Sequence, residues 1–194
     1  MRKPWIVARY TDAQDAIVQY LSASVRNVSI LHDAREKLGS GQGKTEWDEQ
    51  RRTSCSEALQ CFIDIAETLE LEGLELTPGA NEQSRLKVAG VEISVRPEVI
   101  VRGDGKKGRF VGAIKLCIGK TNELDQKTAE YITTVLHQYV AEQVEGEGET
   151  TDYRQCRVLD VFASRLYEAP LAFKARRKDI EAACQEIALL WEVV

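Results

Sequence analysis

Apolar residues recur at helical spacing near both ends of the chain. Residues 11–38 carry apolar side chains at steps of three, four or seven, which predicts one helix that ends at Gly39. A second stripe predicts a helix from about Ser54 to Leu71. Residues 172–192 have the same period and predict a closing helix whose inward side chains are Ile180, Ala183, Cys184, Ile187, Leu190 and Trp191.

The middle of the chain changes to strand spacing. Val91, Ile93 and Val95 alternate with polar residues, Pro97 interrupts the pattern, and residues 98–102 resume it. Residues 103–108 are polar and glycine-rich, which predicts a hairpin loop. Residues 109–118 form the next strand, and apolar side chains on both of its faces indicate a central strand that is covered twice.

A helix over residues 123–143 and a strand over 156–167 complete the predicted order α, α, β-β-β, α, β, α. A helix that crosses between the third and fourth strands favours an α/β fold with a central mixed four-stranded sheet flanked by helices. We expect residues 1–53 to be a helical extension packed on an α/β core of residues 54–194, in one compact unit.

Two short motifs lie on the predicted strands: Pro97-Glu98, and Ala113-Ile114-Lys115. Together with the element order they resemble the core of the PD-(D/E)XK nuclease superfamily, which has a restriction-endonuclease-like fold. In that family an acid follows proline on the second strand, and an acid and a lysine lie two residues apart on the third. Side chains two apart point the same way, so the acids can share Mg²⁺ while the lysine stabilises charge on the phosphate.

The resemblance implies that Glu98 and Lys115 occupy catalytic positions, whereas Ala113 replaces the central metal ligand. A relocated acid from the preceding helix, Glu67 or Glu70, is one replacement. In an active enzyme the catalytic residues would then be Glu98, Lys115 and Glu67, with Glu98 binding Mg²⁺. The alternative is that Glu67 and Glu70 are solvated residues of the helix surface.

Lys115 has two interpretations, because its strand is predicted to be central and an unpaired buried lysine is costly. It is either a retained site lysine that faces a cleft, or a lysine near the sheet edge that pairs with Glu98 or extends to solvent.

The net charge of −5 argues against a general nucleic-acid coat or an electrostatic membrane binder. Local basic runs are still present, and they form candidate phosphate-backbone contacts: Lys106, Lys107 and Arg109 in the hairpin, and Lys174, Arg176, Arg177 and Lys178 in the last helix. The alternative is an ordinary solvated surface.

The remaining sequence features give weaker evidence for a function. Residues 39–45 end in Gly-Lys-Thr, but the spacing of the glycines and the preceding helix argue against a phosphate-binding loop. His32 and His137 each lack a second ligand at helical spacing. Five cysteines without a CxxC pair fit neither a zinc site nor a disulfide framework, so we expect a reducing compartment, the cytoplasm. No run is long enough to span a membrane.

The sequence therefore favours a non-catalytic PD-(D/E)XK-like domain that binds a protein or a nucleic acid, without a cofactor. The alternative is a nuclease that depends on Mg²⁺ and uses a relocated acid. The apolar stripe of the N-terminal helix is a further candidate surface, for pairing with a second subunit.

Overall fold

The computed structural model describes residues 9–41, 43–80, 85–106, 108–121 and 123–191. Its contacts divide the chain into two compact units. The first unit consists of the residues up to Glu72 together with Leu116–Glu123 and Asp160–Arg165. The second consists of the remaining three segments, Gly73–Lys115, Leu124–Leu159 and the residues from Leu166 on. Residue 53, where we expected a domain boundary, lies inside a helix.

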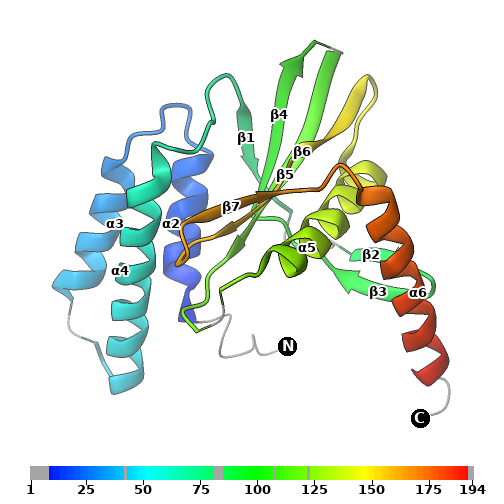
Figure 1. The fold of residues 1–194 in the computed structure, drawn as a ribbon. Helices are drawn as coiled ribbons and strands as arrows, with labels where there is room; N and C mark the ends of the chain where they lie inside the picture. Colours follow the sequence, from blue (N-terminus) through cyan, green and yellow to red (C-terminus); the bar gives the residue numbers. More distant parts are fainter. Residues whose placement is uncertain (1–8, 42, 81–84, 107, 122, 192–194) are drawn as a thin grey trace. The chain divides into compact units, whose positions relative to one another are not determined.

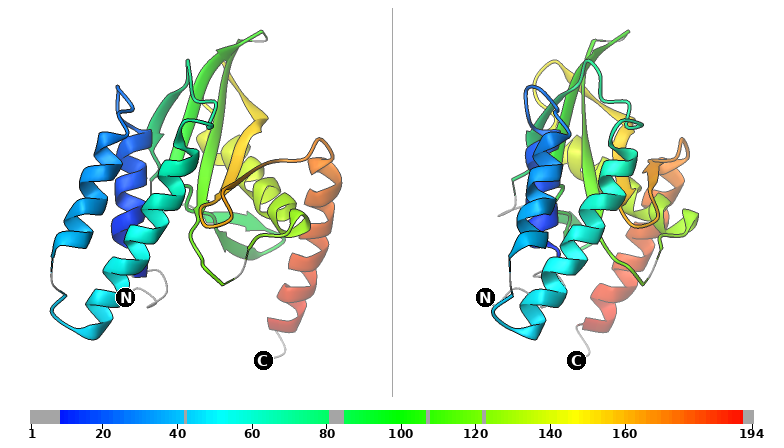
Figure 2. Two further views of the ribbon diagram at one scale, coloured as in Figure 1. Left: turned by 60° about the vertical axis from the view of Figure 1, so that its left-hand side comes forward. Right: turned by 90° about the vertical axis from the view of Figure 1, so that its left-hand side faces the viewer.

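Three helices make up most of the first unit: α2 (Thr11–Leu21), α3 (Ser29–Ser40) and α4 (Glu46–Ala66). Each packs on the other two, and they lie side by side in all views of Figures 1 and 2. Their apolar stripes form the centre of this unit through Ala13, Ile17, Tyr20, Leu21, Leu31, Leu59 and Phe62. The stripe of α2, a candidate subunit contact, is thus buried within the unit.

The single helix predicted for residues 11–38 is wrong, because the chain breaks between α2 and α3. Arg26 Nε donates to the carbonyl of Leu21 at the end of α2, 3.1 Å away. Asn27 Oδ1 accepts from the backbone N–H of Ser29, 2.9 Å away, at the start of α3. These side chains satisfy helix-terminal backbone groups and so favour two short helices over one. The apolar pattern steps by seven residues from Leu21 to Val28, across the break. Because a step of seven also fits a continuous helix, the pattern did not show that the helix ends.

The main sheet has five strands: β1 (Glu75–Pro78), β4 (Val99–Gly105), β5 (Gly108–Cys117), β6 (Glu149–Asp160) and β7 (Arg165–Glu168), in that order. The predicted α/β class is confirmed, but the count of four strands is wrong. The predicted strand 156–167 is in fact a hairpin, since Asp160 accepts the N–H of Ala163 and Ser164 adopts a positive φ of 52°.

The strands β1, β4 and β5 are antiparallel neighbours. Strand β6 follows β5 in the same direction, since Gly112 faces the backbone of Gln155 and Val161 donates to the carbonyl of Cys117. The sheet is therefore mixed. A Cβ on Gly112 would lie 2.4 Å from the carbonyl oxygen of Gln155, so only glycine permits this close approach.

Two further strands, β2 (Arg85–Val88) and β3 (Val91–Ser94), form a separate antiparallel hairpin. Its two-residue turn, Ala89-Gly90, has positive φ at both positions (45° and 88°), as a type I′ turn requires. We expected β3 and the strand beginning at residue 98 to be two strands of one sheet, whereas the structure assigns them to different sheets.

The second unit also contains α5 (Gln126–Tyr139), a short π-helix η1 (Val140–Val144) and α6 (Phe173–Trp191). Asp125 caps α5 by accepting the N–H of Thr128, 2.9 Å away. Helix α6 packs on α5 and on both strands of the β2–β3 hairpin. A shared core unites these elements through Leu86, Val88, Val95, Ile100, Val111, Ala113, Leu136, Tyr139, Val140, Cys156, Ala169 and Cys184.

The prediction that the whole apolar stripe of α6 faces inward is wrong. Cys184 is buried and Ile180 is partly buried, but Ile187, Leu190 and Trp191 are 42%, 68% and 81% exposed. The stripe packs on α5 and the hairpin only along its first half. Its apolar period continues beyond that contact, and its last two turns present these side chains to solvent.

Candidate functional site

Glu98 and Lys115 meet at one end of the β4–β5 pair. Glu98 immediately precedes β4, and the register that pairs Val99 with Ile114 brings it beside Lys115. Its N–H donates to the carbonyl of Ile114 at 3.0 Å. Lys115 Nζ lies 2.7 Å from Glu98 Oε1, and the two side chains are 26% and 5% exposed. The strand register therefore creates a largely buried ion pair.

The segment before Glu98 completes a polar cluster that consists of Glu98, Lys115 and the carbonyl of Arg96. Arg96 adopts a positive φ of 44°, which is unfavourable for a residue with a side chain, and Pro97 follows it. The carbonyl of Arg96 accepts a second hydrogen bond from Lys115 Nζ, at 2.9 Å. On the other side, the N–H of Gly79 donates to the carbonyl of Glu98 at 2.9 Å. The position of Glu98 is thus fixed by both neighbouring segments, and Lys115 bridges its carboxylate to the Arg96 carbonyl.

Ala113 lies two residues before Lys115 on β5. Its side chain is completely buried and belongs to the apolar core of the unit, with Leu136 and Cys156 among the members of that core. A carboxylate here would lose its water without gaining a cation, because Lys115 is already paired. The position that would hold a central metal ligand is therefore part of the hydrophobic core.

A cavity of about 280 Å³ adjoins Lys115. It lies between β3 and α5, and all of its lining residues belong to the second unit. Among the described residues that line it, Lys115 is the charged one, and the others are almost all apolar: Ile93, Ser94, Val95, Tyr131, Ile132, Val135 and Leu136. The sequence pattern identified Ile132, Val135 and Leu136 as a core-facing stripe, but their helical period alone does not show that some of them border a cavity.

The two acids considered as replacements for a ligand at Ala113 lie beyond the helix that was expected to carry them. Helix α4 ends at Ala66, so Glu67 is its C-terminal flanking residue and Glu70 follows beyond the helix. Both are exposed. Within the described parts of the chain, no group of three or more His, Cys, Asp and Glu side chains could hold a metal ion. Glu98 is the acid that the cluster itself contains, and it binds Lys115.

Two of the seven basic residues singled out in the sequence, Arg109 and Arg176, are paired with acids. Arg109 pairs with Glu75 at 3.1 Å and with Glu149 at 3.3 Å. Arg176 pairs with Glu130 at 2.5 Å, and this contact holds the pKa of Glu130 below its ordinary value. Lys106 and Lys174 are exposed, and Lys107 lies outside the described residues.

Arg177 has an unusual partner. Its Nη2 lies 2.8 Å from Nδ1 of His137, which is 6% exposed, and its guanidinium stacks over Phe173. Because arginine can only donate, His137 accepts at Nδ1 and carries its proton on Nε2. Burial, and then the charge of Arg177, lower the pKa of His137 to about 4. This histidine is therefore neutral near pH 7 and joins α5 to α6.

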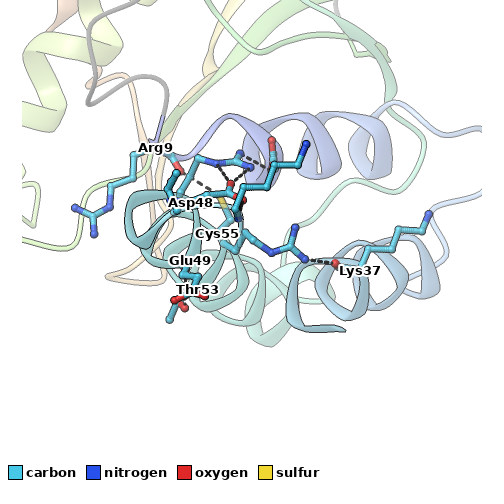
Figure 3. Close-up of polar contacts among 11 residues, drawn as sticks. Arg9, Lys37, Asp48, Glu49, Thr53 and Cys55 are labelled. Carbon is cyan, nitrogen blue, oxygen red and sulfur yellow. Dashed lines mark hydrogen bonds and ion pairs between the residues drawn. The ribbon is translucent and has the colours of Figure 1, made fainter. Parts of the chain in front are cut away.

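The Gly-Lys-Thr segment acts as a helix start. Thr45 Oγ1 accepts the N–H of Asp48 at 3.2 Å, and Asp48 Oδ2 accepts the N–H of Lys44. Figure 3 shows Asp48 within a network of polar contacts on α4, and an arginine of that helix reaching the carbonyl of Lys37. These contacts explain the Gly-Lys-Thr residues as helix capping, without a bound phosphate.

The cysteines are free thiols, and two of them are deeply buried. Burial raises the pKa of Cys156 to about 12 and also raises that of Cys55. Both thiols therefore stay protonated near neutral pH and act as small core residues rather than nucleophiles.

Comparison of the sequence with protein-family models finds no match, and a search of curated proteins finds none either. Among the helices that the structure describes, none is both long and apolar enough to cross a bilayer.

Proposed function

We propose that this chain is a non-catalytic binding module with a PD-(D/E)XK-like core, and that its partner is a protein. The element order supports the likeness to that core. Helix α4 precedes the antiparallel neighbours β1, β4 and β5, and α5 then leads to β6, which is parallel to β5. Glu98 immediately precedes β4 and lies beside Lys115 of the neighbouring strand β5, close to where the family motif has its acid and lysine.

The observation that carries the non-catalytic proposal is the environment of Ala113. Its burial in the core, two residues from a lysine already neutralised by Glu98, favours a structural role for what is left of the motif. Breaking such a pair is costly, so a domain that lost its activity would retain it.

A protein partner is favoured over a nucleic acid for two reasons. The chain carries a net charge of −5, and Arg109 and Arg176 are paired with acids. The end of α6 also exposes an apolar surface of Ile187, Leu189, Leu190 and Trp191. Clusters of exposed apolar side chains, tryptophan above all, are typical of protein interaction sites. The reduced cysteines fit the proposed cytoplasmic location.

The test is affinity capture with the full chain, followed by reconstitution with the purified partner. We expect Leu190→Asp with Trp191→Asp to reduce binding at least tenfold, because both changes place charge in the apolar surface. Lys115→Ala should leave the affinity of the folded protein unchanged. Undiminished binding by the α6 variant would remove this surface from the proposal.

A nuclease dependent on Mg²⁺ is the second candidate, and the adjacency of Glu98 and Lys115 favours it. That function requires cleavage of DNA or RNA by the purified chain with Mg²⁺ or Mn²⁺, and loss of cleavage in Lys115→Ala and in Glu67→Gln. We expect no cleavage with either metal. Cleavage that Lys115→Ala abolishes would overturn the non-catalytic proposal.

A further inference from the structure

The cavity beside Lys115 is lined by apolar side chains that remain partly in contact with water. Ile93, Ile132 and Val135 are each only partly buried, although their side chains form its wall. Its volume of about 280 Å³ is roughly twice that of a protein cavity, about 150 Å³, known to accept benzene. Removing this surface from water would favour an apolar ligand of about two fused rings.

Two cations at or beside the cavity, Lys115 and Arg176, are paired with acids. Lys115 is paired with Glu98, and Arg176, which stacks over Tyr131 at 5.2 Å, is paired with Glu130. The hydroxyl of Tyr131 donates to Asp179 at 3.2 Å. A charged ligand would therefore lose its hydration without meeting an unpaired charge at Lys115 or Arg176.

Lys115 nevertheless offers a polar contact. An ammonium group has three N–H donors, and two of them meet Glu98 Oε1 and the carbonyl of Arg96. The side chain is 26% exposed and forms part of the cavity wall. The third N–H can therefore serve an acceptor on a bound molecule, while Glu98 and Arg96 hold the ammonium group in place.

We propose that this cavity binds a small uncharged molecule with an apolar body of about two rings and one hydrogen-bond acceptor, such as a ketone oxygen, which accepts from Lys115 Nζ. This site is independent of the protein-binding surface on α6. Loss of one leaves the other intact, so each is tested separately.

Three ligands that share a skeleton test the proposal: indanone, indane and aminoindane. Binding to the full chain is followed by NMR, through the methyl signals of Ile93, Ile132 and Val135. We expect indanone to bind about tenfold more tightly than indane, because it alone gains a hydrogen bond from a charged donor. The cationic aminoindane should bind more weakly than either, since it meets the ammonium of Lys115.

Two variants assign this binding to the cavity. Ile132→Trp fills the space and should abolish binding of indanone and indane. Glu98→Gln with Lys115→Met removes the donor without leaving a buried charge, and should equalise the affinities of indanone and indane. The matched control, Glu57→Gln with Lys120→Met, changes an exposed pair elsewhere and should retain the tenfold preference. Unchanged methyl signals with every ligand, or binding that survives in Ile132→Trp, would overturn the proposal.

Discussion

Among the residues that the structure describes, two lysine–glutamate pairs of the same chemistry lie in opposite environments. Lys115 and Glu98 lie 2.7 Å apart in the second unit, called here the sheet unit. Lys120 and Glu57 lie 2.9 Å apart in the first unit, which contains α2, α3 and α4 and is called the helical unit. The side chains of the first pair are 26% and 5% exposed, and those of the second are 59% and 43% exposed. Burial, and not the distance between the charges, therefore decides what each pair contributes.

The two environments imply different responses to mutation. Removing one member of a buried pair leaves a charge without water or partner, which typically costs about 3–5 kcal/mol. Removing one member of an exposed pair leaves a charge that water solvates. Substitutions at the two pairs, and changes of pH, distinguish these responses.

Ala113→Asp should have the largest effect, because it adds a third charge next to the buried pair, at a completely buried position. We expect a loss of about 4 kcal/mol in the free energy of unfolding, measured from urea transitions. Ala182→Asp, at an exposed position on α6, is the control and should have a small effect. A folded Ala113→Asp protein that cleaves nucleic acid with Mg²⁺ would instead favour the nuclease.

Lys115→Met should lower the free energy of unfolding by about 3 kcal/mol, since it leaves the carboxylate of Glu98 buried without its lysine. The double change Glu98→Gln with Lys115→Met should be milder, because it removes both charges. The same urea transitions measure both proteins. If the double variant were the less stable of the two, burial of Glu98 would not be the source of the cost.

The contrast between buried and exposed groups also predicts how stability depends on pH, through the buried His137. The pKa of His137 is lowered to about 4 from an ordinary 6.5, so between these values the unfolded chain binds a proton that the folded chain does not. Stability should therefore fall as the pH falls from about 6.5 toward 4, and stay constant above 6.5 as far as this group is concerned. After allowance for solvent screening we expect a loss of about 2 kcal/mol.

Urea transitions at several pH values measure this loss. His137→Gln should remove most of it, whereas His32→Gln, which changes an exposed residue on α3, should not. An unchanged pH dependence in His137→Gln would assign the effect to other groups.

Lys120→Met should have the smallest effect, with no measurable shift of the urea midpoint, because both members of its pair are solvated. Added salt should not change this result. A loss comparable to that of Lys115→Met would mean that burial does not separate the two pairs.

The α/β class and the β4–β5 hairpin could be predicted from the sequence, because period-two alternation identified the strands. The sequence left Lys115 with two interpretations, and the structure shows that it both pairs with Glu98 and lines a cavity. The carbonyl of Arg96 could not be predicted as the second acceptor, because a positive φ at an arginine before proline has no sequence signature.

Helix α6 shows a limit of what an apolar pattern can predict. Its apolar period is continuous from Ile180 to Trp191, yet only its first half meets α5 and the hairpin. Periodicity identifies the apolar face of a helix, whereas the length of the elements packed on it decides how much is covered. The missed β1 strand and the split of the strand at 156–167 have another cause. Strands β1 and β7 have four residues each and bury one side chain each, so neither shows the alternation that identifies a strand.

The division of the chain into units has a consequence for folding order. The polypeptide contributes to the helical unit three times, through the residues up to Glu72, Leu116–Glu123 and Asp160–Arg165. A ribosome-bound chain that has emerged only as far as Glu72 lacks the two later segments, which bring in the Lys120–Glu57 pair and the edge-to-face contact of Phe162 with Tyr10. The helical unit therefore cannot reach its final set of contacts until most of the sheet has been synthesised, and an excised N-terminal fragment is an incomplete unit.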